Sequence, residues 1–194
     1  MRVFIAVLVL IFSLQSWTKA DDISDFEIEG ISIGDSLLDY VSKEFINKNK
    51  NNVYDGQDIY NIVLIKKPSF TVYDSIQVHF EKNDQNFSIR GLDGFIYYIN
   101  NIEDCYNKQK EIAFDISQEL EDEEMLTDNG KHPGDETGKS TYSRTSFFLT
   151  ERSTGAEIEI ICFNNSKEFI FDDKLSVTFY SDEYSDFLHN YYRK

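Results

Sequence analysis

The sequence predicts an α+β domain in which one twisted antiparallel sheet carries two or three helices packed on one face. Segments whose apolar residues alternate with polar ones, typical of half-buried strands, occur in blocks along the 194-residue chain. Segments with apolar residues three and four positions apart, typical of amphipathic helices, separate these blocks. Turn residues lie between consecutive strands, and hairpins of this kind build antiparallel sheets.

The N-terminus has the pattern of a secretory signal peptide. Arg2 gives a positive start, and residues 3–14 form a run of twelve residues in which Ser13 is the only polar one. This run is shorter than the roughly 20 apolar residues that a membrane-spanning helix needs. Thr18 and Ala20 offer the small side chains that signal peptidase accepts, so we expect cleavage after Ala20.

Removal of residues 1–20 would leave residues 21–194 as a single exported domain that is periplasmic or secreted. The alternative is an uncleaved N-terminal anchor, which the lack of a polar helix face and of a second apolar run disfavours. The remaining chain has 17 basic against 35 acidic residues, a formal charge of −18. A field of this sign repels phosphate backbones and anionic lipid, so we expect no nucleic-acid partner and no membrane anchoring of the mature form.

The first part of the domain predicts a short strand, a helix and a buried strand. Residues 25–31 alternate apolar side chains with acids, which indicates an extended segment. Apolar residues at helical spacing predict a helix over residues 37–45, with Asp35 or Ser36 as N-cap. After a polar loop, the short apolar run 59–65 indicates a buried strand.

A meander of antiparallel strands is expected next. Residues 82–85 are turn residues between two alternating segments. Gly91 and Gly94 lie in a Gly-Leu-Asp-Gly step that predicts a further break before a third run. The three expected strands cover residues 74–81, 86–90 and 95–98.

The second half of the chain predicts a long helix, a loop, more strands and a last helix. Asn100 and Glu103 form a plausible capping pair for a helix over residues 100–122. Residues 121–143 are acidic, carry three glycines and show no apolar period, so we interpret them as a flexible acidic loop. Ser181 is a candidate cap for a C-terminal helix. The expected strands between these segments cover residues 144–151, 156–164 and 175–180.

The two cysteines, Cys105 and Cys162, are both predicted to face the core. Cys105 continues an apolar stripe of the long helix, and Cys162 shares a strand face with Ile158 and Ile160. In an oxidising compartment we expect one disulfide joining helix to sheet. Two buried free thiols are the alternative, and a catalytic thiol is disfavoured because a Cys-x-x-Cys spacing is missing.

Titratable side chains offer no recognisable catalytic motif. His79 lies on the polar side of its predicted strand, and we expect it, like His132 and His189, to be a surface residue. No catalytic residue and no cofactor is predicted. Hard oxygen donors in the acidic segment are weak candidates for a divalent cation, but the calcium-loop order is absent and a solvated loop is favoured. These candidates are Asp128, Asp135 and Glu136.

Tyrosines are frequent and fall on the polar sides of predicted strands and on the last helix. They would suit a binding surface, because they provide large contact area at low entropic cost. Packing within sheet and core is the favoured interpretation. The tyrosines concerned are Tyr97, Tyr98, Tyr180, Tyr184, Tyr191 and Tyr192.

The motif Glu-Gly-Ile-Ser-Ile-Gly-Asp-Ser-Leu-Leu at residues 29–38 resembles the opening of a group of exported proteins from marine alphaproteobacteria. In that group a signal peptide precedes the motif, and one cysteine in a helix and another in an Ile-rich strand follow it, here Cys105 and Cys162. The resemblance implies export and carries over no activity.

The turn at residues 33–36 is similar, at the level of scaffold, to β-lactamase inhibitor protein and the small outer-membrane assembly lipoproteins. There a Gly-containing turn starts a helix that packs on a curved antiparallel sheet. The chain departs from the lipoproteins because no cysteine follows the apolar run, so the resemblance implies no lipid attachment. A shared scaffold does not fix function.

Taken together, these features favour a non-catalytic exported module that binds a protein or a small ligand through one sheet face or the acidic loop. The alternative is a hydrolase-like or metal-assisted enzyme whose site is dispersed over several strands.

Overall fold

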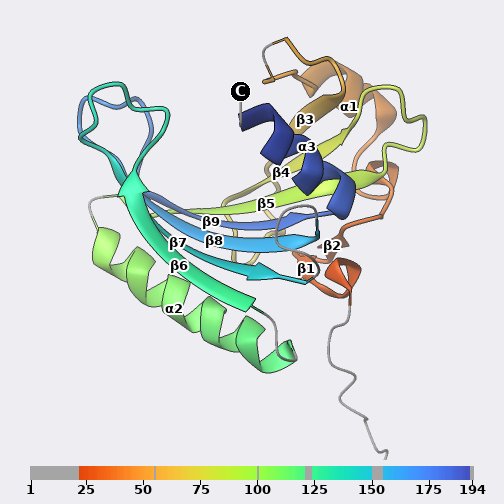
Figure 1. The fold of residues 1–194 in the computed structure, drawn as a ribbon. Helices are drawn as coiled ribbons and strands as arrows, with labels where there is room; N and C mark the ends of the chain where they lie inside the picture. The colour runs from red at the N-terminus through yellow and green to blue at the C-terminus, as the bar shows by residue number, and fades with distance from the viewer. Residues whose placement is uncertain (1–21, 55, 100, 121–123, 150–154, 193–194) are drawn as a thin grey trace, which may run out of the picture.

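The computed structural model describes residues 22–54, 56–99, 101–120, 124–149 and 155–192. The predicted leader, residues 1–20, and the capping residue Asn100 lie outside the described residues. The fold is an α+β fold built on one antiparallel sheet, as the sequence predicts (Figure 1).

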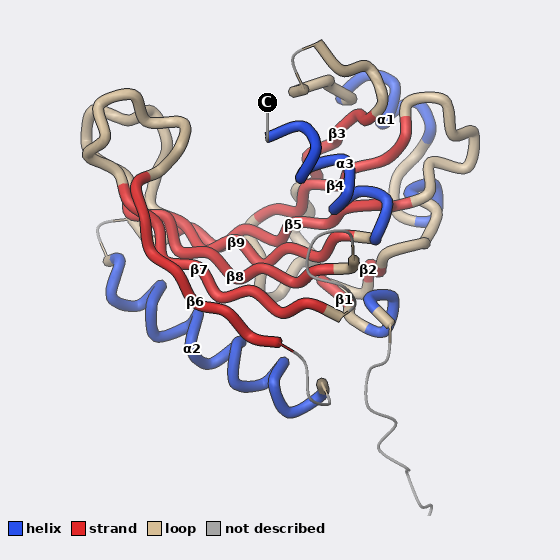
Figure 2. The backbone as a smooth tube through the Cα atoms, in the orientation of Figure 1, coloured by secondary structure: helices blue, strands red, loops and turns tan. Residues whose placement is uncertain are grey.

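Seven antiparallel strands form the main sheet, and a small two-stranded sheet precedes them. The order across the main sheet is β3 (Tyr60–Ile65), β4 (Ser75–Glu81), β5 (Ile89–Tyr97), β9 (Lys174–Tyr180), β8 (Glu157–Asn164), β7 (Thr141–Phe148), β6 (Glu124–Lys131). The small sheet pairs β1 (Glu27–Ile28) with β2 (Ile31–Ser32). The main sheet is twisted and strongly curved (Figure 2).

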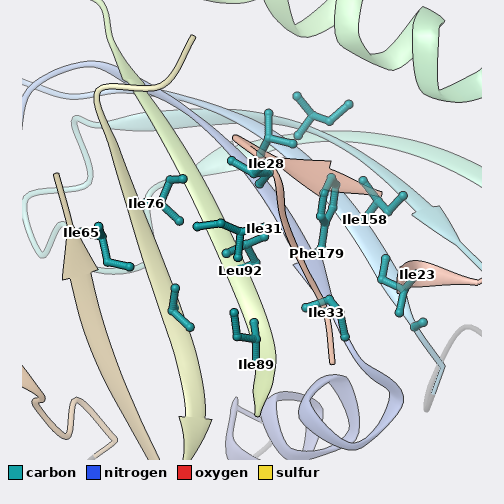
Figure 3. Packing of buried hydrophobic residues seen from close by; sticks show 14 of the residues in the cluster. Ile23, Ile28, Ile31, Ile33, Ile65, Ile76, Ile89, Leu92, Ile158 and Phe179 are labelled. Carbon is teal, nitrogen blue, oxygen red and sulfur yellow. The ribbon is translucent and has the colours of Figure 1, made fainter. Parts of the chain in front are cut away.

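One face of the sheet is apolar and holds the core. Ile76, Val78 and Phe80 of β4 alternate onto this face and are fully buried. Two helices cover it, α1 (Lys43–Asn49) and α2 (Ile102–Glu119), together with the N-terminal segment. Figure 3 shows residues of β1 and β2 lying over those of β5 and β9. Burial of this continuous apolar surface is the main driving force for the fold.

Helix α2 is fixed to the sheet by a disulfide and by a buried amide. Cys105 of α2 is bonded to Cys162 of β8, with 6.0 Å between their Cα atoms, as predicted. One turn further along, Gln109 Nε2 donates hydrogen bonds of 2.8 Å to the carbonyl oxygens of Ser143 and Ile160. These contacts hold α2 across β7 and β8.

Helix α3 (Asp182–Tyr192) lies on the opposite face, which we call the polar face (Figure 1). Ser181 caps it as predicted, because its Oγ accepts a hydrogen bond from the backbone N–H of Tyr184 at 3.3 Å. Tyr184 packs over Gly91 and His79, whose neighbour Val78 faces the apolar core. Successive side chains of a strand alternate between faces, so α3 and α2 enclose the sheet from two sides.

The predicted helix over residues 37–45 is wrong in its extent. The structure has a short 3₁₀ turn, Leu37–Asp39, and α1 begins at Lys43. Ser36 caps the turn, as expected, but it also donates a hydrogen bond of 2.7 Å to the carbonyl oxygen of Asn86. Ser42 then caps α1 through a bond from the Phe45 N–H at 3.1 Å. Tertiary anchoring and a second cap divide the segment.

The predicted break at Gly91 and Gly94 is also wrong, because both lie inside the continuous strand β5. A Cβ atom at Gly91 would lie 2.5 Å from Tyr184 on the polar face, and one at Gly94 would lie 2.6 Å from Tyr73. These glycines therefore make room for aromatic rings on either face of a strand, a known use of glycine in sheets.

The interpretation of residues 121–143 as a flexible acidic loop is corrected by the structure. Residues Glu124–Lys131 form β6, which pairs with β7 over eight residue pairs. As an edge strand it shows no clear apolar alternation, which is why the sequence pattern missed it. The loop after it packs on residues 165–173: Lys139 Nζ lies 2.8 Å from Glu168 Oε1, and Ser140 Oγ accepts from the Ser166 N–H at 2.9 Å.

Candidate functional site

The polar face carries an open groove of about 830 Å³. It lies where β3 and β5 end and β9 begins, at the opposite end of the sheet from α3 (Figure 1). Phe95 and Gln77 belong to its floor, and the loop before β9 forms one wall. We call this site the groove; its lining residues are Leu64, Lys66, Asp74, Gln77, Phe95, Tyr97, Ile99, Ile170, Phe171, Asp172 and Lys174.

The rim of the groove concentrates exposed apolar side chains. Ile170 is 88% exposed and Ile99 69% exposed, although water solvates such side chains poorly. Together with Leu64, Tyr97 and Phe171 they line one site. Contiguous exposed apolar surface marks interaction sites more often than scattered single side chains do.

Lys174 is the half-buried cation of the groove. Its Nζ lies 4.4 Å from the ring centroid of Phe95 and 5.5 Å from that of Phe163. Burial lowers the pKa of this ammonium group, and the negative charge of Asp93 offsets the shift only in part. Within the described residues, no carboxylate lies at ion-pair distance from it.

The other charged residues of the groove stand at its rim. Lys66, Asp74 and Asp172 are exposed. The Asp74 carboxylate accepts a hydrogen bond of 2.9 Å from the backbone N–H of Tyr97. The rim is therefore mixed in sign, and the only half-buried charge of the groove is positive.

A buried polar network adjoins the groove through Gln77. Gln77 Nε2 donates to Asp93 Oδ2 at 3.2 Å, and His79 Nε2 lies 2.6 Å from the same oxygen. Thr178 Oγ1 donates to the other carboxylate oxygen of Asp93 at 2.9 Å. His79 is only 4% exposed, so its prediction as a surface residue is wrong.

Two tyrosines close this network from the side of α3. Tyr184 OH lies 2.5 Å from His79 Nδ1, and Tyr54 OH lies 3.1 Å from it. Because Asp93 accepts from Nε2, Nδ1 is the acceptor for a hydroxyl proton. Burial raises the pKa of both tyrosines, so both stay protonated as donors. The rings of Tyr60 and Phe187 pack around them. The hydrogen-bonded side chains are called the His79 network below; they are His79, Asp93, Tyr54, Tyr184, Gln77 and Thr178.

The order Asp93, His79, Tyr184 is that of an acid, a base and a hydroxyl in hydrogen-bonded series. A nucleophile of this kind must reach its substrate. Tyr184 is 1% exposed and Asp93 6% exposed, and neither these two nor His79 lines the groove. The arrangement ties α3 to the sheet and fixes Gln77.

The three weak cation candidates are engaged elsewhere or stand alone. Asp128 on β6 forms an ion pair of 2.8 Å with Arg144 Nε, and Arg144 Nη1 also contacts the buried Glu159 at 2.9 Å. Hydrogen bonds from the hydroxyl groups of Ser140 and Thr137, and from their backbone N–H groups, lower the pKa of Asp135. Glu136 is exposed. Among the described residues, no three His, Cys, Asp or Glu side chains gather as a metal site would require.

The remaining histidines and the predicted tyrosines divide between packing and the groove. His132 is half-buried against the rings of Phe163 and Phe169, and His189 lies in the last turn of α3. Tyr97 lines the groove, whereas Tyr184 belongs to the His79 network. The others belong to neither site: Tyr98 packs against the apolar core, and Tyr180, Tyr191 and Tyr192 lie at or on α3.

Lys174 and the apolar rim are the parts of the site that sequence reasoning missed. The available signal was a lysine placed directly before an alternating strand and directly after two acids. A lysine in that position normally pairs with its neighbours at the surface. The pairing of β9 with β5 on one side and with β8 on the other places it between Phe95 and Phe163.

Fold and groove together define a small α+β domain that presents a partly apolar groove on an antiparallel sheet. Comparison with protein-family models, curated proteins and solved structures finds no match to this chain. In the part of the chain that the structure describes, no helix has the length and apolar character needed to cross a bilayer.

Proposed function

We propose that the protein is an exported, non-catalytic binding module of the cell envelope, periplasmic or secreted, that holds its ligand in the groove. The observation that carries this proposal is the convergence of five exposed apolar side chains on a groove of about 830 Å³. Sites for small ligands usually have volumes of roughly 300–1,000 Å³ and mostly apolar walls with a few polar groups.

Export is supported by the disulfide between Cys105 and Cys162. Disulfides persist in oxidising compartments and are rare in the reducing cytosol. The predicted leader, residues 1–20, supplies the export signal in this proposal. The mature form is then free of the membrane.

The alternative, a hydrolase-like enzyme, would use the series Asp93, His79 and Tyr184. Their low exposure argues against it, because an active site needs converging groups in an accessible pocket. A metal-assisted reaction would need a cluster of ligands, and the groove itself contributes only Asp74 and Asp172 as carboxylates. The binding function therefore agrees better with the geometry.

Binding can be tested with N-phenyl-1-naphthylamine, an uncharged dye that fluoresces in apolar surroundings. The full chain is expressed with its own leader and recovered from the exported fraction. We expect saturable binding that Phe171→Ser weakens about tenfold, because a large part of one aromatic contact is lost. Phe114→Ser is the matched control: Phe114 on α2 is 64% exposed, Phe171 is 55% exposed, and only Phe171 lines the groove.

Equal dye affinity of the two Phe→Ser variants would overturn the assignment of the groove as the binding site. Esterase or glycosidase turnover that disappears in His79→Gln while dye binding persists would instead support the enzyme alternative.

A further inference from the structure

We infer that the groove selects a small, singly charged anion with an apolar body, such as an alkyl or aryl carboxylate or sulfonate, and that Lys174 contacts the anionic group. This inference rests on the proposed function and names the ligand class of the same site. It follows from the position of Lys174, the state of the neighbouring acids and the charge of the whole chain.

The position of Lys174 is unusual for a chain with 35 acidic and 19 basic residues. Other lysines find carboxylates at the surface: Lys108 Nζ lies 2.7 Å from Glu111, and Lys139 Nζ lies 2.8 Å from Glu168. Lys174 instead sits inside the groove between two aromatic rings. Its three N–H donors have no carboxylate partner within the described residues.

The acid whose charge acts on Lys174 is committed to other donors. Asp93, the acid that acts on it through space, accepts hydrogen bonds from His79, Gln77 and Thr178. The carboxylate oxygens of Asp93 are therefore already engaged by three donors on the polar face of the sheet.

A partly desolvated ammonium group without a counter-ion is unfavourable, and burial indeed lowers the pKa of Lys174. An anion delivered by a ligand would restore the lost interaction. Charged pairs in such partly buried sites are stronger than exposed pairs, because the local dielectric is lower and screening is weaker. Lys174 is thus the place in the groove where a negative charge gains most.

The rest of the molecule limits how much charge the ligand carries. The formal charge of the whole chain is −16, and its field repels polyanions such as nucleotides with several phosphates. A single charge experiences the smallest repulsion of this kind. The apolar rim formed by Leu64, Ile99, Ile170 and Phe171 then binds the body of the ligand.

The test uses a matched pair of dyes. 8-Anilinonaphthalene-1-sulfonate is N-phenyl-1-naphthylamine with an added sulfonate group. On the exported full-length product we expect the sulfonate dye to bind about tenfold more tightly than the neutral dye. Lys174→Met should abolish this difference, because the sulfonate then loses its cation, and Lys174→Arg should keep it.

Lys66→Met is the control, because Lys66 lines the same groove but is exposed. We expect it to change the sulfonate affinity by less than about twofold, as exposed ion pairs contribute little. Displacement adds a second readout: decanoate should displace the bound sulfonate dye, whereas decyltrimethylammonium, of the same chain length and opposite charge, should not. Far-ultraviolet circular dichroism establishes that each variant is folded.

The outcomes separate the inference from the proposed function. If the neutral dye binds in a Phe171-dependent manner but the sulfonate dye gains nothing, or gains equally in Lys174→Met, the anion selectivity is overturned and the binding function stands. If the affinity of neither dye depends on Phe171, both the anion selectivity and the proposed binding function are refuted.

Discussion

His79 Nε2 on β4 lies 2.6 Å from Asp93 Oδ2 on β5, and both residues are almost closed to solvent. The pair occupies the polar face of the sheet. Without α3 over that face, these polar groups would be exposed to water. Tyr54 and Tyr184 enclose it from the segment before β3 and from α3. This one relationship links three distant parts of the chain and holds Gln77 at the floor of the groove.

Asp93→Ala should strongly destabilise the fold. It removes the acceptor of hydrogen bonds from His79, Gln77 and Thr178, and each buried donor left without a partner costs about 1–3 kcal/mol. Urea denaturation measures the loss. Asp172→Ala, an exposed acid of the groove rim, is the control and should change stability by less than about 0.5 kcal/mol. A similar small effect for Asp93→Ala would contradict the role of the network.

Gly91→Ala should loosen the contact between α3 and the sheet. The added Cβ would lie 2.5 Å from Cε1 of Tyr184, and overpacking of this kind typically costs about 1–3 kcal/mol. Gly134→Ala is the comparison, because its Cβ would come no closer than 3.2 Å to an atom of the half-buried His132 ring. Hydrogen exchange should show faster opening of α3 in the first variant only; unchanged protection there would argue against close packing of Tyr184.

A variant without the disulfide should be less stable than the disulfide-bonded wild type by about 4 kcal/mol in the chain-entropy model, because the bridge closes a long loop. The sequence separation of Cys105 and Cys162 is 57 residues. Chemical denaturation of wild type and of the Cys105→Ala/Cys162→Ala variant, each with and without dithiothreitol, measures the effect. Dithiothreitol should lower the stability of the wild type only. Equal stability of wild type and variant in the absence of dithiothreitol would refute the prediction.

The preference for the sulfonate dye should decline as pH rises through the pKa of Lys174. Burial places that pKa below 10.5, and a neutral amine no longer attracts the anion, so the decline begins below pH 10.5. The other charged groups around Lys174 are Lys66, Asp74, Asp172 and the hydrogen-bonded Asp93. Fluorescence titration over pH 7 to 10.5 measures the preference, with the neutral dye as reference.

Lys174→Arg should keep the preference over the same range, because a guanidinium group stays charged.

The lowered pKa of Lys174 also determines how the stability of the fold changes with pH. Below the pKa of Lys174 in the folded protein its buried charge opposes folding, and this penalty fades as pH rises toward 10.5. Lys174→Met should therefore be at least as stable as wild type at pH 7, and a clear loss of stability would show that the lysine is structural.

The exported protein should begin at Asp21. N-terminal sequencing of material from the exported fraction measures this, and Ala20→Arg, which places a large charged side chain in the cleavage site, should block processing. An exported chain that begins at Met1 would refute the predicted cleavage of residues 1–20.

Local patterns predicted much of the fold. The alternation in β4, β8 and β9 and the helical stripes of α2 and α3 are periodic signals that need no knowledge of partners. The inward orientation of Cys105 and Cys162 followed from the same periodicities and led to the correct pair. The edge strand β6 was not predicted, because its sequence shows no clear alternation of apolar and polar residues.

The site was not predictable in the same way. His79 lies on the polar side of its strand, as alternation indicates, yet it is buried because α3 returns over that face. Gly91, directly opposite His79 in the sheet, was the only local hint that something bulky packs there. Lys174 carries no hint, since its surroundings come from β5, β8 and the loop before β9.

The sequence by itself determined most of the strands, the helices α2 and α3, the acidic charge and the cysteine pair, because each depends on spacing or composition within one segment. The tertiary structure alone decided which polar residues are buried and where apolar side chains meet in a groove. Those properties depend on how a curved sheet brings segments together that are far apart in the chain, and no local periodicity contains that information.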